Sequence, residues 1–257
     1  MKVVLFCGGR GMRMREFSET IPKPMVPIGP RPILWHLMRY YAHFGHTDFV
    51  LCLGYRGDSI KRYFVEYQEW ESNDFVLNGG NPDMLSTDLD EWNITFVDTG
   101  LDANIGERLH AVREHLDGEE MFLANYGDGL SDADLSVMVD DLEQSDAVGN
   151  FICVPPSQSF HVVRVDDNDR AVAFQPADDA GILVNGGFFV FRSELWDHLN
   201  PGEELVQEPL QRLMDKKQLI AHRHDGFWMG MDTFKDRQVL DELYQSGNAP
   251  WEVWKGR

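Results

Sequence analysis

The sequence is poor in cysteine, in long apolar runs and in basic residues. It has three cysteines among 257 residues, an odd number without metal-ligand spacing, which argues against a disulfide framework and a zinc site. No apolar run reaches the roughly 18 residues of a membrane-spanning helix. The N-terminus turns glycine-rich too early for a signal peptide. We therefore expect a cytoplasmic protein with no membrane partner, in which Cys7, Cys52 and Cys153 are buried thiols.

Basic side chains are outnumbered by acidic ones. The chain has 23 Lys and Arg against 43 Asp and Glu, so its net charge is -20. This balance argues against nucleic-acid binding, which needs a basic face. A polyanionic ligand would have to be bound by a few local cations, because the overall field repels it.

The arrangement of apolar residues predicts an α/β fold. In the first half, strands are expected at residues 2–7, 48–53, 94–97 and 121–125, and helices at residues 32–44, 58–70 and 106–116. This alternation predicts a doubly wound, mostly parallel sheet. Further along, strands are expected at residues 148–154, 162–165, 172–174, 188–191 and 219–224, and helices at residues 205–217 and 233–245.

We predict a single domain over residues 1–257, with a first part to about residue 147 and a second part from about residue 148. Ser131 or Asp132 is expected to cap the helix that follows the fourth strand. Residues 71–91, rich in Asp, Asn, Gly and Ser, are the longest irregular stretch. A loop of that length in a compact domain is usually functional or an oligomer contact.

A glycine-rich loop follows the first predicted strand, with the sequence Gly8-Gly9-Arg10-Gly11-Met12-Arg13. Glycines let the backbone approach a phosphate and direct amides at it, and an arginine adds a charged fork for phosphate oxygens. The spacing matches neither a Walker loop nor a dinucleotide fingerprint. An ordinary strand-to-helix turn is the alternative interpretation.

Two further positions carry charge on constrained backbone. Lys23 stands between Pro22 and Pro24, whose stiffness keeps the ammonium group aimed; the alternative is a solvated lysine in a turn. Asp128 lies between Gly127 and Gly129, directly after a predicted strand. Open α/β sheets bind ligands at that edge, although a turn aspartate is the alternative.

Ordered blocks along the chain resemble the sugar-1-phosphate nucleotidyltransferase family, in its glucose-1-phosphate cytidylyltransferase branch. They cover nearly the whole chain. The blocks are the glycine loop, Pro22-Lys23-Pro24-Met25, Arg31-Pro32-Ile33-Leu34-Trp35-His36, Val97-Asp98-Thr99-Gly100, Tyr126-Gly127-Asp128-Gly129, Asn185-Gly186-Gly187-Phe188, Gly226-Phe227-Trp228 and Met231-Asp232-Thr233.

The resemblance implies a Rossmann-like nucleotidyltransferase fold with a C-terminal sugar-binding subregion, and it implies a role for each matching position. Arg13 and Lys23 would be catalytic, and Asp128 and Asp232 would bind Mg²⁺. The nucleotide would be held by Cys7, Gly8, Gly9, Gly11, Arg13, Lys23, Gly127 and Asp128. The acceptor would be held by Asn185, Gly186, Gly187 and Trp228, and His161 is a further acceptor candidate at a position where this chain departs from the family.

The acceptor half departs from the family pattern. The family usually carries F-x-E-K-P before the Asn-Gly-Gly block, whereas this chain reads Phe174-Gln175-Pro176 without the Glu-Lys pair. His161 stands where a glycine is common, and Met229-Gly230 where Gln-Pro is common. Either His161 replaces a donor of the acceptor site, or it is an ordinary strand histidine; Arg164 is a second candidate. In the glycine loop, Met12 and Met14 replace Thr and Leu.

The expected activity is transfer of a nucleotidyl group from CTP to a sugar 1-phosphate, with Mg²⁺ as cofactor. One alternative is the same chemistry on a different phosphorylated acceptor, with glucose 1-phosphate used poorly. The other is a nucleotide- or sugar-binding regulatory protein that has lost catalysis. A homo-oligomer is expected from the family, with residues 71–91 as a contact.

Overall fold

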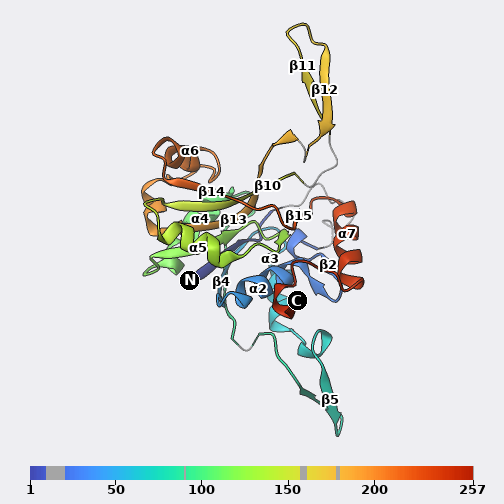
Figure 1. Ribbon diagram of the computed structural model, residues 1–257. Coiled ribbons are helices and arrows are strands. Elements are labelled where there is room, and N and C mark those ends of the chain that lie inside the picture. The colour runs from blue at the N-terminus through green and yellow to red at the C-terminus, as the bar shows by residue number, and fades with distance from the viewer. Residues whose placement is uncertain (10–20, 90, 157–160, 178–179, 257) are drawn as a thin grey trace.

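A seven-stranded sheet forms the centre of the protein, in a computed structural model that describes residues 1–9, 21–89, 91–156, 161–177 and 180–256 (Figure 1). The strand order is β14-β10-β13-β8-β1-β4-β7. In this sheet β13 runs antiparallel to β8 and β10, while the other pairings are parallel. The predicted α/β fold with a mostly parallel sheet is confirmed.

The strands of the sheet are β1 (Lys2–Phe6), β4 (Asp48–Leu53), β7 (Asn93–Asp98), β8 (Met121–Asn125), β10 (Gly149–Val154), β13 (Val184–Arg192) and β14 (Leu219–Arg223). Both faces of the central strands are covered. In β1, Val3 and Leu5 belong to the core on one face, and Val4 and Phe6 to the core on the other. Parallel strands buried on both faces read as continuous apolar runs, which is why these strands were predictable.

Helices cover both faces of the sheet, as a doubly wound fold requires. One core includes residues of α2 (Ile33–His43), α3 (Gly57–Val65), α5 (Leu135–Glu143) and α7 (Phe234–Gln245). The other includes residues of α4 (Ile105–Ala111) and α6 (Glu208–Asp215). The short 3₁₀ helices are η2 (Lys23–Met25), η3 (Glu69–Glu71), η4 (Arg113–Leu116), η6 (Ser193–Asp197) and η7 (Val253–Lys255). No helix in the described ranges has both the length and the apolarity to cross a membrane.

Three predicted helices are shorter than expected. The helix expected over residues 58–70 ends at Val65, and the one expected over residues 106–116 ends at Ala111, each followed by a 3₁₀ turn. The helix expected over residues 205–217 begins at Glu208, with Pro209 in its first turn. Proline is favoured in a first turn because its missing N–H has no intrahelical partner there.

A short two-stranded ribbon is formed by β9 (Gly129–Ser131) and β15 (Trp228–Gly230), which pair antiparallel. The sequence did not predict it. Because Ser131 belongs to a strand, the expected cap at Ser131 or Asp132 is wrong. Asp134 caps α5 instead, and its carboxylate accepts a hydrogen bond from Ser136 N at 3.0 Å. The strands β2 (Pro27–Ile28) and β3 (Arg31–Pro32) form a second small pair.

Two hairpins project from opposite ends of the molecule (Figure 1). One joins β11 (His161–Val165) to β12 (Ala171–Pro176), and the other joins β5 (Phe75–Asn78) to β6 (Asn81–Met84). The second hairpin corrects the prediction that residues 71–91 are irregular. Every residue of β5 is exposed, so the strand has no buried face that would produce an apolar alternation in the sequence.

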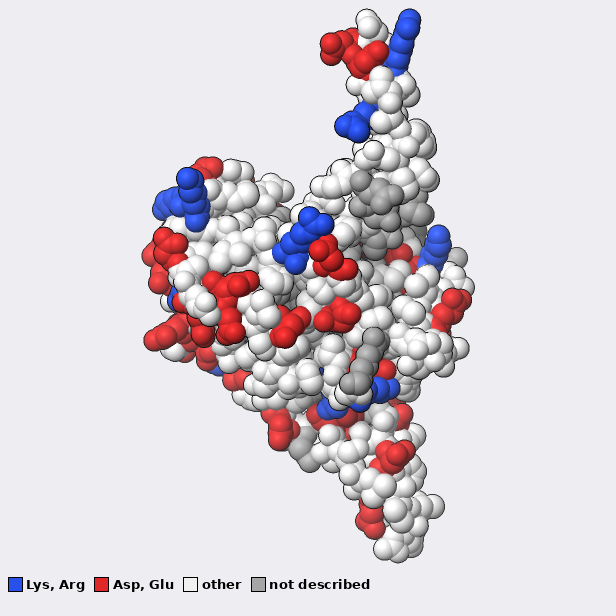
Figure 2. Space-filling model, viewed as in Figure 1, with Lys and Arg blue, Asp and Glu red and all other residues white. Residues whose placement is uncertain are grey.

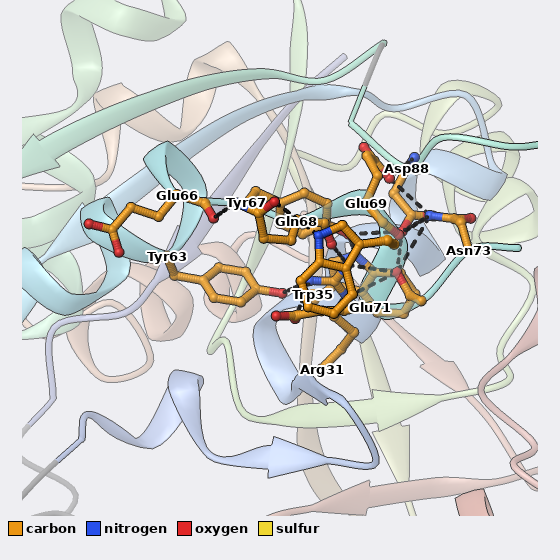
Figure 3. A network of polar contacts seen from close by, with 12 residues as sticks. Arg31, Trp35, Tyr63, Glu66, Tyr67, Gln68, Glu69, Glu71, Asn73 and Asp88 are labelled. Carbon is orange, nitrogen blue, oxygen red and sulfur yellow. Dashed lines mark hydrogen bonds and ion pairs between the residues drawn. The ribbon is translucent and has the colours of Figure 1, made fainter. Parts of the chain in front are cut away.

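A buried polar network fastens the base of the β5–β6 hairpin to the body (Figure 3). The Arg31 side chain is 1% exposed, and its guanidinium lies 3.1 Å from a Glu71 carboxylate oxygen. It also donates to Ser72 Oγ, which in turn donates to Asp88 at 2.7 Å. Tyr67 OH donates to the same Asp88 oxygen at 2.8 Å. Buried charges are costly unless paired, so this pairing fixes the direction in which the hairpin leaves the body.

Candidate active site

Three charged side chains from distant parts of the chain meet at one edge of the sheet. Lys23 Nζ donates to Asp128 Oδ2 at 2.6 Å and to Asp232 Oδ1 at 2.8 Å. The Lys23 side chain is 14% exposed, and the two carboxylates are 30% and 37% exposed. The structure therefore brings together the predicted catalytic lysine and both predicted metal ligands, with the carboxylates open to solvent.

The backbone around Lys23 is fixed, as its two prolines predicted. Pro22 is extended, with φ of -71° and ψ of 151°, and Lys23 opens the single turn η2. The Lys23 carbonyl accepts from Val26 N at 3.1 Å, and Pro24 is buried. Burial by itself lowers the pKa of Lys23, but the charges and hydrogen bonds of Asp128 and Asp232 outweigh it, so the pKa is raised. Lys23 is therefore a permanent cation of this site.

Asp128 is held at the carboxyl end of β8 by the conformation of Gly127. That glycine has a positive φ of 77°, and its N–H donates to Asn125 Oδ1 at 2.9 Å. A Cβ at this position would lie 3.0 Å from the Phe6 carbonyl oxygen, so a side chain would be both strained and crowded. This edge of an open α/β sheet is the usual place for ligands.

Asp232 reaches the same place through the β9–β15 ribbon. β15 ends at Gly230, and Met231 N donates to the Asp128 carbonyl at 2.9 Å. The Asp232 N–H is held by Asp236 Oδ2 at 3.0 Å, and Asp236 also completes the capping box of α7 with Thr233. The backbone on both sides of Asp232 is thus anchored.

The two carboxylates suit a hard divalent cation. Magnesium is bound by oxygen ligands and commonly takes one or two protein carboxylates, with phosphate oxygens and water completing the shell. Within the described ranges, no cluster of three or more His, Cys, Asp or Glu residues could hold a metal. A pair of partly exposed carboxylates therefore fits a cation that is shared with a phosphorylated ligand.

The glycine loop is described only at its start. Cys7 N donates to the Cys52 carbonyl at 2.9 Å, and the Gly8 carbonyl accepts from Tyr55 N at 3.2 Å. Burial raises the pKa of the Cys7 thiol, so Cys7 stays protonated and is not a thiolate nucleophile. Cys7, Cys52 and Cys153 are free and buried, as predicted. The proposed roles of Gly11 and Arg13 fall on residues outside the described ranges.

Arg108 is a site residue that the sequence did not reveal. It is 3% exposed, and its guanidinium donates to Thr99 Oγ1 at 2.8 Å, to the Gly100 carbonyl at 2.9 Å and to the Gly8 carbonyl at 3.2 Å. It also donates to the Leu53 carbonyl at 3.3 Å. A Cβ on Gly8 would collide with this guanidinium. Arg108 therefore joins the carboxyl ends of β1, β4 and β7, whereas a lone arginine in a helix reads as a solvated side chain.

Four of the predicted acceptor residues lie on β13 and β15. Asn185 Nδ2 donates to Tyr126 OH at 3.0 Å, and Asn185 Oδ1 accepts from Gly187 N at 2.9 Å. Gly187 has a φ of 77°, and a Cβ there would lie 2.5 Å from the Tyr126 ring. Trp228 Nε1 donates to the Gly186 carbonyl at 2.8 Å. Tyr126, two residues before Asp128, thus links the predicted acceptor residues to the turn that carries Asp128.

His161 lies at the base of the β11–β12 hairpin, where it pairs with Pro176. It is exposed, at the first position of β11, and its ring stacks on Phe174 of the same hairpin with centroids 5.3 Å apart. This stacking agrees with the alternative interpretation, an ordinary strand histidine. Arg164 is likewise exposed, on the same strand.

Acidic residues dominate the charge of the chain, whose net charge is -20. Acidic side chains spread over the face seen in Figure 2, with Lys and Arg in a few separate groups. The positive charge of Lys23 is already paired with two carboxylates. A bound metal would add positive charge where an incoming triphosphate needs it.

The chain matches the Nucleotidyl transferase family model over residues 2–237. It is 36% identical over 257 residues to a protein of Bacillus subtilis named probable glucose-1-phosphate cytidylyltransferase, with 99% of this chain and 100% of that one covered. It is also 36% identical over 258 residues to glucose-1-phosphate cytidylyltransferase of Salmonella typhi, with 99% and 100% covered.

Solved structures of similar architecture support the fold. UDP-glucose pyrophosphorylase from Acinetobacter baumanii has a TM-score of 0.71 at 18% identity, over 98% of this chain and 96% of that one. HddC from Yersinia pseudotuberculosis has a TM-score of 0.67 at 17% identity, over 95% and 99%. The predicted Rossmann-like nucleotidyltransferase fold is confirmed. With a family model that spans most of the sequence, the chain belongs to the nucleotidyl transferase family.

Proposed function

We propose that this protein transfers a cytidylyl group from CTP to a sugar 1-phosphate, which gives a CDP-sugar and pyrophosphate with Mg²⁺ as cofactor. The observation that carries the proposal is Lys23 held between Asp128 and Asp232, at 2.6 and 2.8 Å, at the ligand-binding edge of the sheet. The choice of CTP rests on relatives at 36% identity that are named cytidylyltransferases.

In this reaction an oxygen of the acceptor phosphate attacks the α-phosphorus of the nucleotide. A new P–O bond forms, and the bond between the α-phosphorus and the oxygen that bridges it to the β-phosphate breaks. Pyrophosphate leaves with the electron pair. The attacking oxygen is already ionised, so no general base is needed, and catalysis depends on bringing two anions together.

The residues of the site match that requirement. Asp128 and Asp232 would hold Mg²⁺, which supplies positive charge for the phosphate oxygens. Lys23, on its rigid turn, would contact the phosphates at the same point. The Gly8 backbone, fixed by Arg108, and the residues Gly11 and Arg13 would hold the triphosphate. Asn185, Gly186, Gly187 and Trp228 would face the sugar.

We propose that the chain is a single domain whose two parts bind the two substrates. We assign nucleotide binding to residues 1–147 and acceptor binding to residues 148–257, although both parts belong to one continuous sheet. The proposed metal site draws on both parts, because Asp232 comes from the second part and Asp128 from the first. The free, buried cysteines suit a reducing compartment, so we place the protein in the cytoplasm.

The test is pyrophosphate release from CTP, Mg²⁺ and a panel of sugar 1-phosphates. The same assay with UTP, dTTP and GTP, together with thermal shifts for each nucleotide, measures the preference for the base. A clear preference for a purine would contradict the choice of CTP. Sustained lack of pyrophosphate with every pair would favour a regulatory protein that binds nucleotides without turnover.

We predict that glucose 1-phosphate is a poor acceptor compared with another phosphorylated acceptor. The family's Glu-Lys pair has no counterpart in Phe174-Gln175-Pro176, so one charge-assisted contact to a dianionic phosphate is lost. Such contacts contribute roughly 1.5–3 kcal/mol, or about one to two decades in kcat/KM. The measurement is steady-state kinetics with glucose 1-phosphate against other hexose 1-phosphates and smaller phosphate esters.

A gain of function tests the same argument. Gln175 is half-buried in β12 and pairs with Val162 near the base of the hairpin. Gln175→Lys is expected to raise kcat/KM for glucose 1-phosphate by about tenfold. Ala173→Lys is the matched control, because Ala173 lies two residues nearer the tip on the same face of the strand. The prediction is wrong if the unaltered protein already uses glucose 1-phosphate best, with kcat/KM of about 10⁴ M⁻¹s⁻¹ or more.

We also predict self-association through the β5–β6 hairpin. Leu77 is 67% exposed and Val76 is 53% exposed, on a two-stranded hairpin that has little stability without a partner surface. Light scattering at micromolar concentration should therefore give a mass above that of one chain. Leu77→Ser should lower that mass, whereas Val65→Ser, at an exposed residue on the body, should not. A strict monomer would overturn the prediction.

A further inference from the structure

The ribbon of β9 and β15 carries both metal carboxylates at one of its ends. Asp128 immediately precedes β9, and Asp232 follows β15 by two residues. The two strands form three residue pairs, from Gly129 opposite Gly230 to Ser131 opposite Trp228. The spacing of the carboxylates therefore depends on the register of this short ribbon. A two-stranded ribbon is marginally stable by itself, so something else must hold the register.

The opposite end of the ribbon is closed by Asp132 and His224. Asp132 Oδ1 accepts from Phe227 N at 2.7 Å and lies 2.9 Å from His224 Nε2. His224 Nε2 also lies 3.2 Å from the Phe227 carbonyl. Both neighbours are acceptors, so Nε2 carries the proton and donates to them. The backbone adds a bond from Asp132 N to the Phe227 carbonyl at 3.1 Å.

The loop between His224 and Phe227 is shaped around this pair. A Cβ on Gly226 would lie 2.5 Å from His224 Cε1 and 2.6 Å from Asp132 Oδ1. The side chains of the pair are 14% and 31% exposed, with His224 the more enclosed. Asp132 and His224 are thus packed closely against the Gly226 backbone, unlike an exposed surface ion pair.

We propose that Asp132 and His224 are a positioning pair for the metal site: they lock the register of the β9–β15 ribbon and thereby set the spacing of Asp128 and Asp232. The inference rests on the proposed metal-binding role of these two aspartates. Asp132 is four positions after Asp128, which is about 13 Å of extended chain, so the pair acts through the ribbon and not by contact. Mg²⁺ demands near-ideal octahedral geometry, so a small shift of one carboxylate weakens its binding.

The test is the affinity for Mn²⁺, measured by electron paramagnetic resonance in the presence of CTP and without acceptor. His224→Ala is expected to weaken Mn²⁺ binding by about tenfold to a hundredfold, the range found when outer partners of metal ligands are removed. It should also raise the metal concentration that gives half-maximal turnover. His224→Gln places an amide N–H where Nε2–H was, so its affinity should stay within about threefold of the unaltered protein.

A second histidine–aspartate pair provides a matched control. His222 Nδ1 lies 3.1 Å from Asp141 Oδ2, which joins β14 to α5 away from the ribbon. His222→Ala should leave Mn²⁺ affinity unchanged. Equal losses in His222→Ala and His224→Ala, or no loss in His224→Ala, would overturn the inference.

Two further measurements keep the result interpretable. If His224→Ala does not fold, His224→Gln and Asp132→Asn replace it: the first should retain the affinity, while the second, which loses the carboxylate charge, should weaken it. The opposite order would overturn the inference. Because Mn²⁺ binding is measured without turnover, failure of the proposed transferase activity would appear in the pyrophosphate assay and would not imitate either result.

Discussion

Asp128→Asn and Asp232→Asn are each expected to lower kcat for pyrophosphate release by about a thousandfold or more, with the fold intact. The amide keeps the shape of the side chain but removes the negative charge that a divalent cation needs. A thousandfold loss corresponds to about 4 kcal/mol of barrier, in the range of the several kcal/mol that a metal supplies as a Lewis acid. The measurement is turnover at saturating CTP, with far-UV circular dichroism as the check on folding.

An aspartate at the tip of the β11–β12 hairpin supplies the control. Asp167→Asn, in the exposed turn between β11 and β12, changes the net charge by the same amount and should leave kcat unchanged. Both site variants should also need more Mn²⁺ for half-saturation. Near-normal pyrophosphate release by either one would show that its carboxylate is not a metal ligand.

The parts of the fold that the sequence predicted best are the buried parallel strands. β4 and β8 have the predicted bounds, Asp48–Leu53 and Met121–Asn125. Each is a continuous apolar run, and burial on both faces makes such a run nearly independent of tertiary detail. Helix ends were less predictable, because they depend on where packing against the sheet stops. Val65, the last residue of α3, is 83% exposed.

Lys23 and Asp128 were predictable for a local reason, whereas their contact was not. The prolines beside Lys23 and the glycines beside Asp128 indicate, from the sequence alone, that the backbone has a special conformation at these positions. Asp232 lies 104 residues after Asp128 in the chain, and it reaches Asp128 through three-residue strands that carry no periodic signal. Only the resemblance to a family suggested the contact. Arg108 shows the same limit, because its partners are mostly backbone carbonyls, which no sequence pattern encodes.

The pairing of Lys23 with both carboxylates affects how tightly metal and nucleotide bind together. The ammonium group of Lys23 offsets the repulsion between Asp128 and Asp232, and it lies within hydrogen-bond distance of both. Lys23 and a metal would therefore compete for the same oxygens. A triphosphate that arrives with the metal gives Lys23 an alternative anion, so metal and nucleotide are expected to bind more tightly together than separately.

Lys23→Met is therefore expected to act in opposite directions on turnover and on metal binding. Turnover should fall by about a thousandfold, because a fixed cation beside the reacting phosphates is lost and oriented charge is the largest contribution to such a reaction. Without nucleotide, the two carboxylates face each other without the Lys23 ammonium, so the variant should bind Mn²⁺ more tightly than the unaltered protein. Added Mg²⁺ should also raise its melting temperature by a larger amount.

Lys23→Arg and Lys61→Met separate this explanation from simple loss of a charge. Arginine keeps the charge, but its planar fork does not reproduce a compact ammonium group between two carboxylates, so turnover should remain low. Lys61 is exposed on α3, and its replacement by Met should change neither turnover nor Mn²⁺ affinity. If Lys23→Met bound Mn²⁺ no better than the unaltered protein, the ammonium would not be competing with the metal. Lys23 would then contribute to turnover only through the phosphates, a role that the kinetics of Lys23→Arg would still report.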